Sequence, residues 1–473
     1  MTEERPAVRA IAWREVFPWL RLLQVFRMAI RPRVLLLAIV AALLCKVGWQ
    51  AIGTMFDGSS DANIAYEGAD GKREFGPVAR LYTRWPWEPL YDVPGPDGGQ
   101  PMRRAVQLQG TNAEISASGP AIFASFLTTR PIKQLVGFGE IFSPTASTSL
   151  TAFLSLCLVW AIAVWAFAGG VITRIAAVGF ARGEQISWNR ATQFGWRKWP
   201  SFFASPMLPI LGVVLIALFM ALFGLIMRIP YIGIPMIAIA WPLFLIGGLL
   251  MAILLLGLVV GWPLMWCTVS CEGTDSFDAL GRSYGYVFGK PLQYLGYGVV
   301  ALVFGWLGWQ VVSIFSELLV NTTQWAVSWG SGGKNMHLVS SLLPFAAKTP
   351  DGVTGLDVWS AKLIYFFNGC VRSIPVAFLY SFFWCGATMI YLLLRRDEDQ
   401  TEIDEVFLED EQETYGMPPL RTDAAGVSQP ADVPAPTPTP KPPAAEKPAA
   451  TEKPASDGKP PAAENDSGPL PLE

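Results

Sequence analysis

The sequence predicts an all-α protein: a polytopic transmembrane helix bundle of about six spans, with a partly ordered extracytoplasmic loop insert and a disordered C-terminal tail. Apolar runs of about twenty residues recur between positions 150 and 394, and runs of that length match the ~30 Å hydrocarbon thickness of a bilayer. Only 15% of the 473 residues are charged, whereas soluble proteins carry about a quarter. The 19 tryptophans also suit membrane–water interfaces, where Trp is enriched.

Changes in composition divide the chain into six segments. They are a cytoplasmic N-terminal arm at 1–32, a first span at 33–56, an extracytoplasmic loop at 57–148, a five-span membrane bundle at 149–395, an acidic cytoplasmic segment at 396–422 and a disordered tail at 423–473. Within these segments we place the spans at 34–56, 150–172, 207–227, 234–260, 295–315 and 375–394.

The N-terminal arm contains an amphipathic helix over residues 11–30. Trp19, Leu23, Phe26 and Ile30 are spaced four, three and four apart, which places them on one helical face, and Arg21 lies on the opposite face. Two interpretations remain open. The helix either lies on an anionic leaflet as a basic amphipathic helix, or packs against the membrane bundle.

The loop at 57–148 is polar and rich in Gly and Pro, with strong turn signals at 94–99. Its length leaves room for a small β-rich insert, with candidate strands at 79–83 and 105–108. Residues 131–142 predict a helix lying at the membrane interface.

Basic residues predict the orientation of the spans, because short cytoplasmic loops are enriched in Lys and Arg. The arm is rich in Arg, and six spans place the basic segment 174–198, the loop with Arg282 and Lys290, and the tail on the same side. We therefore expect a multi-pass protein of the bacterial inner (cytoplasmic) membrane with both termini cytoplasmic. No cleavage site follows the first apolar run, which predicts an uncleaved anchor.

Residues able to support catalysis are scarce. His337 is the single histidine, in the predicted outer loop between the last two spans, and this excludes His-based triads and most zinc chemistry. Cys267 and Cys271 would share a helix face, and we interpret them as small buried hydrophobes. We assign no catalytic, cofactor-binding or metal-binding residue and no cofactor, and a concentrated basic face for nucleic acid is lacking.

Three carboxylates before the fifth span form an acidic cluster: Glu272, Asp275 and Asp278. They would suit a cation, but a solvated loop leading into a helix is the favoured interpretation. Lys46 is the one charge well inside a span. We expect its ammonium to snorkel outward, with Gln50 and Glu317 as the alternative partners. This scarcity of buried charge argues against an ion-coupled transporter.

Two short motifs suggest an internal repeat. Residues 194–200 and 284–291 both read aromatic, Gly, aromatic, then Lys and Pro, at the start of the third and fifth spans. A parallel repeat of helix, cytoplasmic elbow and helix would explain the match. The alternative is that interfacial aromatics and prolines are common wherever a chain enters the membrane.

After residue 394 the chain becomes acidic and then rich in Pro, Ala and Lys. Ile403, Val406, Phe407 and Leu408 interrupt the acidic run, so this part predicts a short helix or strand that docks. From residue 423 onward too little apolar surface is available for folding, and the tail is expected to stay disordered.

The elbow from Glu272-Gly273 through Ala279-Leu280-Gly281-Arg282-Ser283-Tyr284 to Lys290-Pro291 resembles that of uncharacterised bacterial polytopic membrane proteins. It is also similar to the membrane domain of some glycerophosphodiester phosphodiesterases, although this chain shows no sign of their catalytic domain. The junction at 391–405 resembles that of planctomycete-type membrane proteins, which implies location only.

The sequence thus predicts a non-enzymatic structural or interaction protein of the cell envelope. Its expected partners are the lipid bilayer and unidentified proteins that contact the outer loop or the tail. The alternatives are a permease or transporter component and a lipid-related membrane enzyme.

Overall fold

The computed structural model describes residues 17–67, 73–85, 93–94, 101–102, 129–143, 145–341, 354–408, 420–422 and 428–430. It divides into two units, Met1–Phe407 and Leu408–Glu473. Across the described residues the first unit is almost entirely helical, which confirms the predicted fold class. Six helices are long and apolar enough to cross a membrane. They are Pro32–Met55, Thr148–Ala181, Trp199–Arg228, Gly233–Glu272, Pro291–Ser331 and Gly355–Asp399.

The described helices and strands have the following bounds. The helices are η1 (Pro18–Leu22), α2 (Leu23–Ala29), α3 (Pro32–Met55), α4 (Pro77–Thr83), α7 (Arg130–Gly137), η3 (Phe138–Phe142), α8 (Thr148–Ala181), α9 (Trp188–Arg197), α10 (Trp199–Gly224), η4 (Leu225–Arg228), α11 (Gly233–Glu272), α12 (Ser276–Gly289), α13 (Pro291–Ser341), α14 (Gly355–Arg372) and α15 (Ile374–Asp399). The strands form three antiparallel pairs: β1 (Ala65–Glu67) with β2 (Arg73–Phe75), β3 (Val93–Pro94) with β4 (Pro101–Met102), and β5 (Leu420–Thr422) with β6 (Ser428–Pro430).

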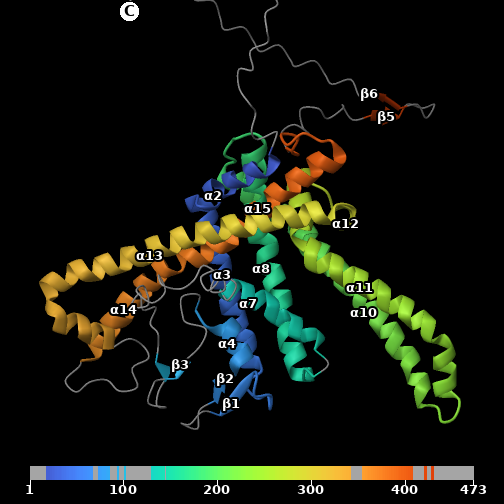
Figure 1. Cartoon of the computed structure of the whole chain (residues 1–473), viewed down its shortest axis with the longest axis horizontal. Coiled ribbons are helices and arrows are strands. Elements are labelled where there is room, and N and C mark those ends of the chain that lie inside the picture. Colours follow the sequence, from blue (N-terminus) through green and yellow to red (C-terminus); the bar gives the residue numbers. More distant parts are fainter. Residues whose placement is uncertain are drawn as a thin grey trace, which may run out of the picture. The chain divides into compact units, whose positions relative to one another are not determined.

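One arrangement of helices occurs three times in the first unit (Figure 1). Helices α8, α11 and α15 contact one another, and each also packs along a second long helix: α3, α10 and α13 respectively. A short helix precedes each of these second helices: α2, α9 and α12. Pro32, Pro200 and Pro291 lie in the first turn of α3, α10 and α13, where a missing N–H costs no intrahelical hydrogen bond. The two predicted elbows are α9 and α12.

The long helices exceed the membrane thickness, and most buried residues of α11 lie in its last turns, from Gly257 onward. Helix α8 has 34 residues, or about 51 Å at 1.5 Å per residue, against a hydrocarbon core of about 30 Å. We call the densely packed end the hub: residues 166–181, 257–272 and 377–399, together with α2, α9 and α12. None of the most apolar window of α10 is buried, as expected of a lipid-facing surface.

Helix α2 packs on the hub through a different face from the predicted one. The buried side chains of η1 and α2 include Leu22, Val25 and Met28, whereas Leu23 and Ile30 of the predicted face are exposed. Helix α2 packs against α15 through a narrow stripe of side chains. This stripe lies next to the more apolar face of α2 that the sequence predicted to be buried. The helix therefore packs against the bundle and keeps an apolar face on the outside.

The segment 57–148, predicted to be the extracytoplasmic loop and called the outer segment below, contains a helix where a strand was expected. Residues 77–83 form α4, because Pro77 suits a first helical turn and Ala79, Tyr82 and Thr83 recur at helical spacing on the buried side. The candidate strand at 105–108 lies outside the described residues. The turn signals at 94–99 fall between β3 and β4, and α7 with η3 confirms the helix predicted at 131–142.

The chain after α15 docks without regular secondary structure. Gln400 has a left-handed backbone with φ of 55° and reverses the chain, and Ile403 and Val406 are buried on the hub. We call residues 400–407 the strap. In the second unit, β5 pairs with β6, which lies within the segment predicted to be disordered. The rest of 409–473 is outside the described residues, as are 1–16.

Candidate functional site

The three central helices meet at a stack of aromatic rings. The rings of Trp266 on α11 and Trp384 on α15 are parallel within 13°, with centroids 4.5 Å apart. A Cβ at Gly169 on α8 would lie 2.7 Å from the Trp266 ring. Only glycine lets α8 approach this stack so closely, so the ring pair and Gly169 fix the spacing of the three helices.

Beyond this stack a buried polar network links α8 to α11. Arg174 is 2% exposed, and its Nη1 donates to the carbonyl of Ser270 at 2.8 Å. Its guanidinium lies 4.3 Å from the ring centroid of Phe194 on α9. The hydroxyl of Thr173 is 2.5 Å from that of Ser270. Burial strengthens each of these contacts, because water no longer competes for the groups.

Glu272, at the end of α11, is the acidic centre of the hub. Its carboxylate accepts hydrogen bonds from Tyr391 of α15 at 2.6 Å and from Arg282 of α12 at 3.1 Å. Nη1 of Arg395 lies 3.9 Å away. Breaking such a partly buried charge network strands the remaining charges. Glu272, at the end of α11, thus connects this helix to both α15 and α12.

The predicted acidic cluster does not converge on a cation. Asp275 is the N-cap of α12 and accepts from the backbone amides of Phe277 and Asp278. Glu272 is held by the pairs just described. Among the described residues, no group of three or more His, Cys, Asp or Glu side chains has the geometry of a metal site.

Arg395 connects the hub to the strap. It is 4% exposed, and its Nη2 donates to the carbonyls of Glu402 and Glu405. The amide of Phe407 donates to the carbonyl of Cys271 at 2.8 Å. That bond satisfies a carbonyl in the last turn of α11, where intrahelical donors run out. The strap is therefore held by backbone bonds as well as by apolar contacts.

The lysines of the two elbow motifs perform the same task. Nζ of Lys198 donates to the carbonyl of Gly273 at the end of α11 at 2.5 Å. Nζ of Lys290 donates to the carbonyl of Asp397 near the end of α15 at 2.6 Å. A cation at a helix C-terminus is stabilised by the free carbonyls and the helix dipole. Each elbow lysine thus caps a central helix.

Tyr286 connects α12 to the end of α15. Its hydroxyl donates to Oδ2 of Asp399 at 2.5 Å. Burial, together with this carboxylate, raises the pKa of Tyr286. The phenol therefore remains a hydrogen-bond donor at neutral pH.

The charges inside the spans are paired differently from expectation. Lys46 is 6% exposed: its Nζ lies 2.5 Å from Oε1 of Gln50, the partner suggested by the sequence, and 3.4 Å from the ring centroid of Trp85. Glu317 instead accepts from Nε of Arg372 at 3.1 Å, which joins α13 to α14. The sequence pointed to Gln50 as a partner but missed Trp85 and Arg372, because both are distant along the chain.

Other residues singled out from the sequence have structural positions. Cys267 and Cys271 are fully buried, as predicted. His337 lies within α13, because this helix continues to Ser341 instead of ending in a loop. Gln134 on α7 was missed: its amide donates to the carbonyl of Leu81 and its oxygen accepts from the hydroxyl of a tyrosine on α15.

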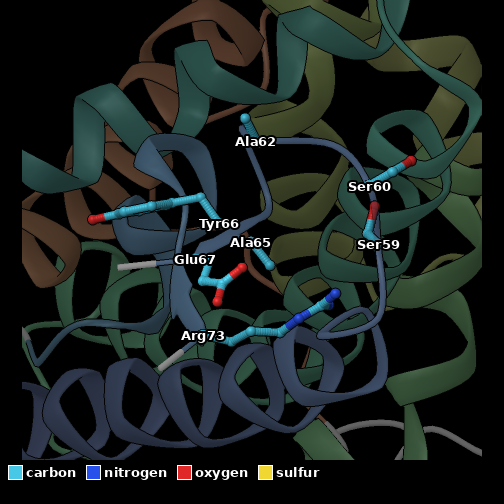
Figure 2. A pocket seen from close by; sticks show the side chains of 7 residues that line it. All are labelled: Ser59, Ser60, Ala62, Ala65, Tyr66, Glu67 and Arg73. Carbon is cyan, nitrogen blue, oxygen red and sulfur yellow. The ribbon is translucent and has the colours of Figure 1, made fainter. Parts of the chain in front are cut away.

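A cavity of about 270 Å³ lies on the outer segment, beside the β1–β2 hairpin (Figure 2). Ser59, Glu67 and Arg73 are among the residues that line it. Figure 2 shows the ring of Tyr66 pointing away from Ser59. Five of its seven lining residues are polar, but Ser60, Glu67 and Arg73 are exposed. A specific ligand pocket encloses most of its ligand, and we place the candidate site in the hub instead.

Comparison with known proteins finds one family. A family model described as a domain of unknown function (DUF7847) matches residues 105–361, which is more than half of the chain. No curated protein and no solved structure matches. The finer resemblances, to planctomycete-type proteins and to the phosphodiesterase membrane domain, stay predictions from the sequence.

Proposed function

Because the chain belongs to the family of the domain of unknown function DUF7847, we propose its role from the hub: a non-enzymatic membrane scaffold that presents its C-terminal segment to a protein partner. The docked strap is the observation that carries this proposal. Hydrogen bonds from the guanidinium of Arg395 to two strap carbonyls, and from the strap amide of Phe407 to the carbonyl of Cys271, hold the strap on the hub. The rest of the acidic segment, from residue 408, therefore begins at a fixed point on the hub.

The chemistry of the hub supports a scaffold over a catalyst. Glu272 and Arg174 bind groups from other helices of the same chain. Their contacts connect α8, α9, α11, α12 and α15, so these charges set helix positions. Buried hydrogen-bond networks of this kind rigidify a core, and rigidity is what a presenting platform requires.

We place the protein in the cytoplasmic membrane of a bacterium, with the hub and both termini inside. Support comes from the basic residues near the hub, since cytoplasmic loops carry the excess of Lys and Arg. Reporter fusions test this orientation. Fusions at Ser187 and Arg396 should report the cytoplasm, and those at Gly98 and Gly332 the outside. A cytoplasmic signal at Gly98 would overturn the orientation.

Partner capture tests the scaffold. The full chain and a chain ending at residue 408 are purified from cells under identical mild detergent conditions, and co-purifying proteins are quantified. A third chain, with 409–473 replaced by a flexible Gly/Ser segment of equal length, controls for steric bulk. Proteins enriched only with the native segment support presentation by the strap. Identical protein sets from all three chains would overturn it, as would turnover of a lipid substrate by the purified protein.

A permease component is the second candidate, and the intramembrane charges favour it. Buried Lys46 and the Glu317–Arg372 pair are the kind of group that marks a transport pathway. Solute uptake by proteoliposomes containing the full chain tests this alternative. Uptake abolished by Glu317→Gln, with insertion intact, would replace the scaffold by a transporter.

A further inference from the structure

We propose that the exposed surface of α9 binds the headgroups of anionic phospholipids, with Arg190 and Arg197 on the phosphates and Trp196, next to Arg197, at the interface. All three side chains are exposed, and Trp196 is 75% exposed. This inference is independent of the proposed scaffold role, because it concerns lipid and requires no protein partner.

The depth of α9 relative to the bilayer follows from its contacts with α8. The predicted span begins at Leu150, so about 20 residues of α8, to Gly170, cross the hydrocarbon. The ring of Trp196 lies 6.0 Å from that of Phe167. Nε1 of Trp199, just after α9, donates to the carbonyl of Ala163 at 3.0 Å. Phe167 and Ala163 lie about 5 and 10 Å inside this end of the span at 1.5 Å per residue, so the chain enters the hydrocarbon at the end of α9, next to the headgroups.

Packing decides which face of α9 points outward. Ala191, Phe194 and Gly195 are buried, and a Cβ on Gly195 would lie 2.3 Å from Cγ2 of Val171. The remaining surface holds Arg190 and Arg197, which are seven residues apart and therefore lie on one side of the helix. Trp196 is also exposed and lies about 100° around the helix from Arg197. An interfacial Trp next to arginines suits the boundary between acyl chains and phosphates.

Charge separates this elbow from the other one. Residues 182–198 contain four cationic side chains and one carboxylate. On α12, Asp275 and Asp278 offset Arg282 and Lys290 in number. The electrostatic attraction of anionic lipid is therefore concentrated on α9, although both elbows expose aromatic rings.

Lipid binding to the full chain tests the proposal. The protein in neutral detergent is titrated with short-chain phosphatidylglycerol or phosphatidylcholine, and bound lipids are counted by native mass spectrometry. We expect tighter binding of phosphatidylglycerol. Arg190→Gln and Arg197→Gln should each weaken it roughly fivefold, since a surface cation contributes about that factor. The Arg190→Lys/Arg197→Lys variant keeps the charge and should keep the preference.

Arg73→Gln is the matched control, because it removes an exposed arginine from β2, away from α9. It should leave phosphatidylglycerol binding unchanged. Unchanged binding by the Arg190→Gln/Arg197→Gln variant would overturn the proposal, and so would an equal loss in the Arg73 control. Displacement of the lipid by millimolar inorganic phosphate would also overturn it, because the site would then recognise a soluble anion.

Discussion

The two glycines of the elbow motifs offer a matched test of the packing in the hub. Gly195 on α9 and Gly285 on α12 hold the same place between two aromatic residues. An added Cβ at Gly195 would lie 2.3 Å from Cγ2 of Val171, whereas at Gly285 it would meet nothing within 4 Å. Val171 is fully buried, and its branched side chain has one favoured rotamer in a helix. It cannot rotate away.

The size of the effect follows from two opposing contributions. Overpacking costs about 1–3 kcal/mol, and replacing Gly by Ala inside a helix contributes about 1 kcal/mol of stability. The helix contribution is common to both substitutions. Gly285→Ala should therefore be neutral or stabilising, and Gly195→Ala should be less stable than Gly285→Ala by about 1–3 kcal/mol.

Thermal unfolding of the two variants and the wild type in one detergent, followed by tryptophan fluorescence, measures this difference. We expect the unfolding midpoint of Gly195→Ala to fall several degrees below that of Gly285→Ala. Equal midpoints for the two variants would refute the close packing of α9 on α8. A midpoint for Gly195→Ala above the wild type would refute it as well.

Three further predictions concern charged groups. Lys46→Met should lower the free energy of unfolding by about 1–2 kcal/mol, because it removes a charged hydrogen bond and a cation–π contact; an unchanged midpoint would show that the ammonium faces water. Glu317→Gln and Arg372→Met should each lower the free energy of unfolding by more than half of the loss in the double variant, because either single change leaves the other charge without its partner. A double-mutant cycle in chemical denaturant measures this coupling. Hydrogen bonds from the Ser147 hydroxyl and the Asn63 amide lower the pKa of Asp61 below its ordinary 3.8. The stability that they contribute is therefore complete above pH 4 and is lost as the pH falls through the lowered pKa. Unfolding midpoints from pH 3 to 7 should show this loss in the wild type and a smaller one in Ser147→Ala.

The sequence alone determined the class of the protein and the number of its spans. A long hydrophobic run by itself predicts a membrane-spanning helix, because a helix satisfies every backbone polar group internally and needs no partner in the hydrocarbon. The same local logic located the two elbows: a proline in the first turn of the following helix marks where α10 and α13 begin. Docking of the acidic segment was likewise visible in Ile403 and Val406, the apolar residues that interrupt it.

Only the tertiary structure determined which face of each helix is buried and which charged residues pair. The more apolar side of α2 is exposed, because a hub of fixed shape accepts Leu22 and Val25 better. Residues 79–83 form a helix because α3 supplies a surface that a helical stripe can bury. The pairing of Glu317 with Arg372 joins residues 55 positions apart. Such contacts depend on how separate helices pack, and a one-dimensional pattern of hydropathy carries no information about which helices become neighbours.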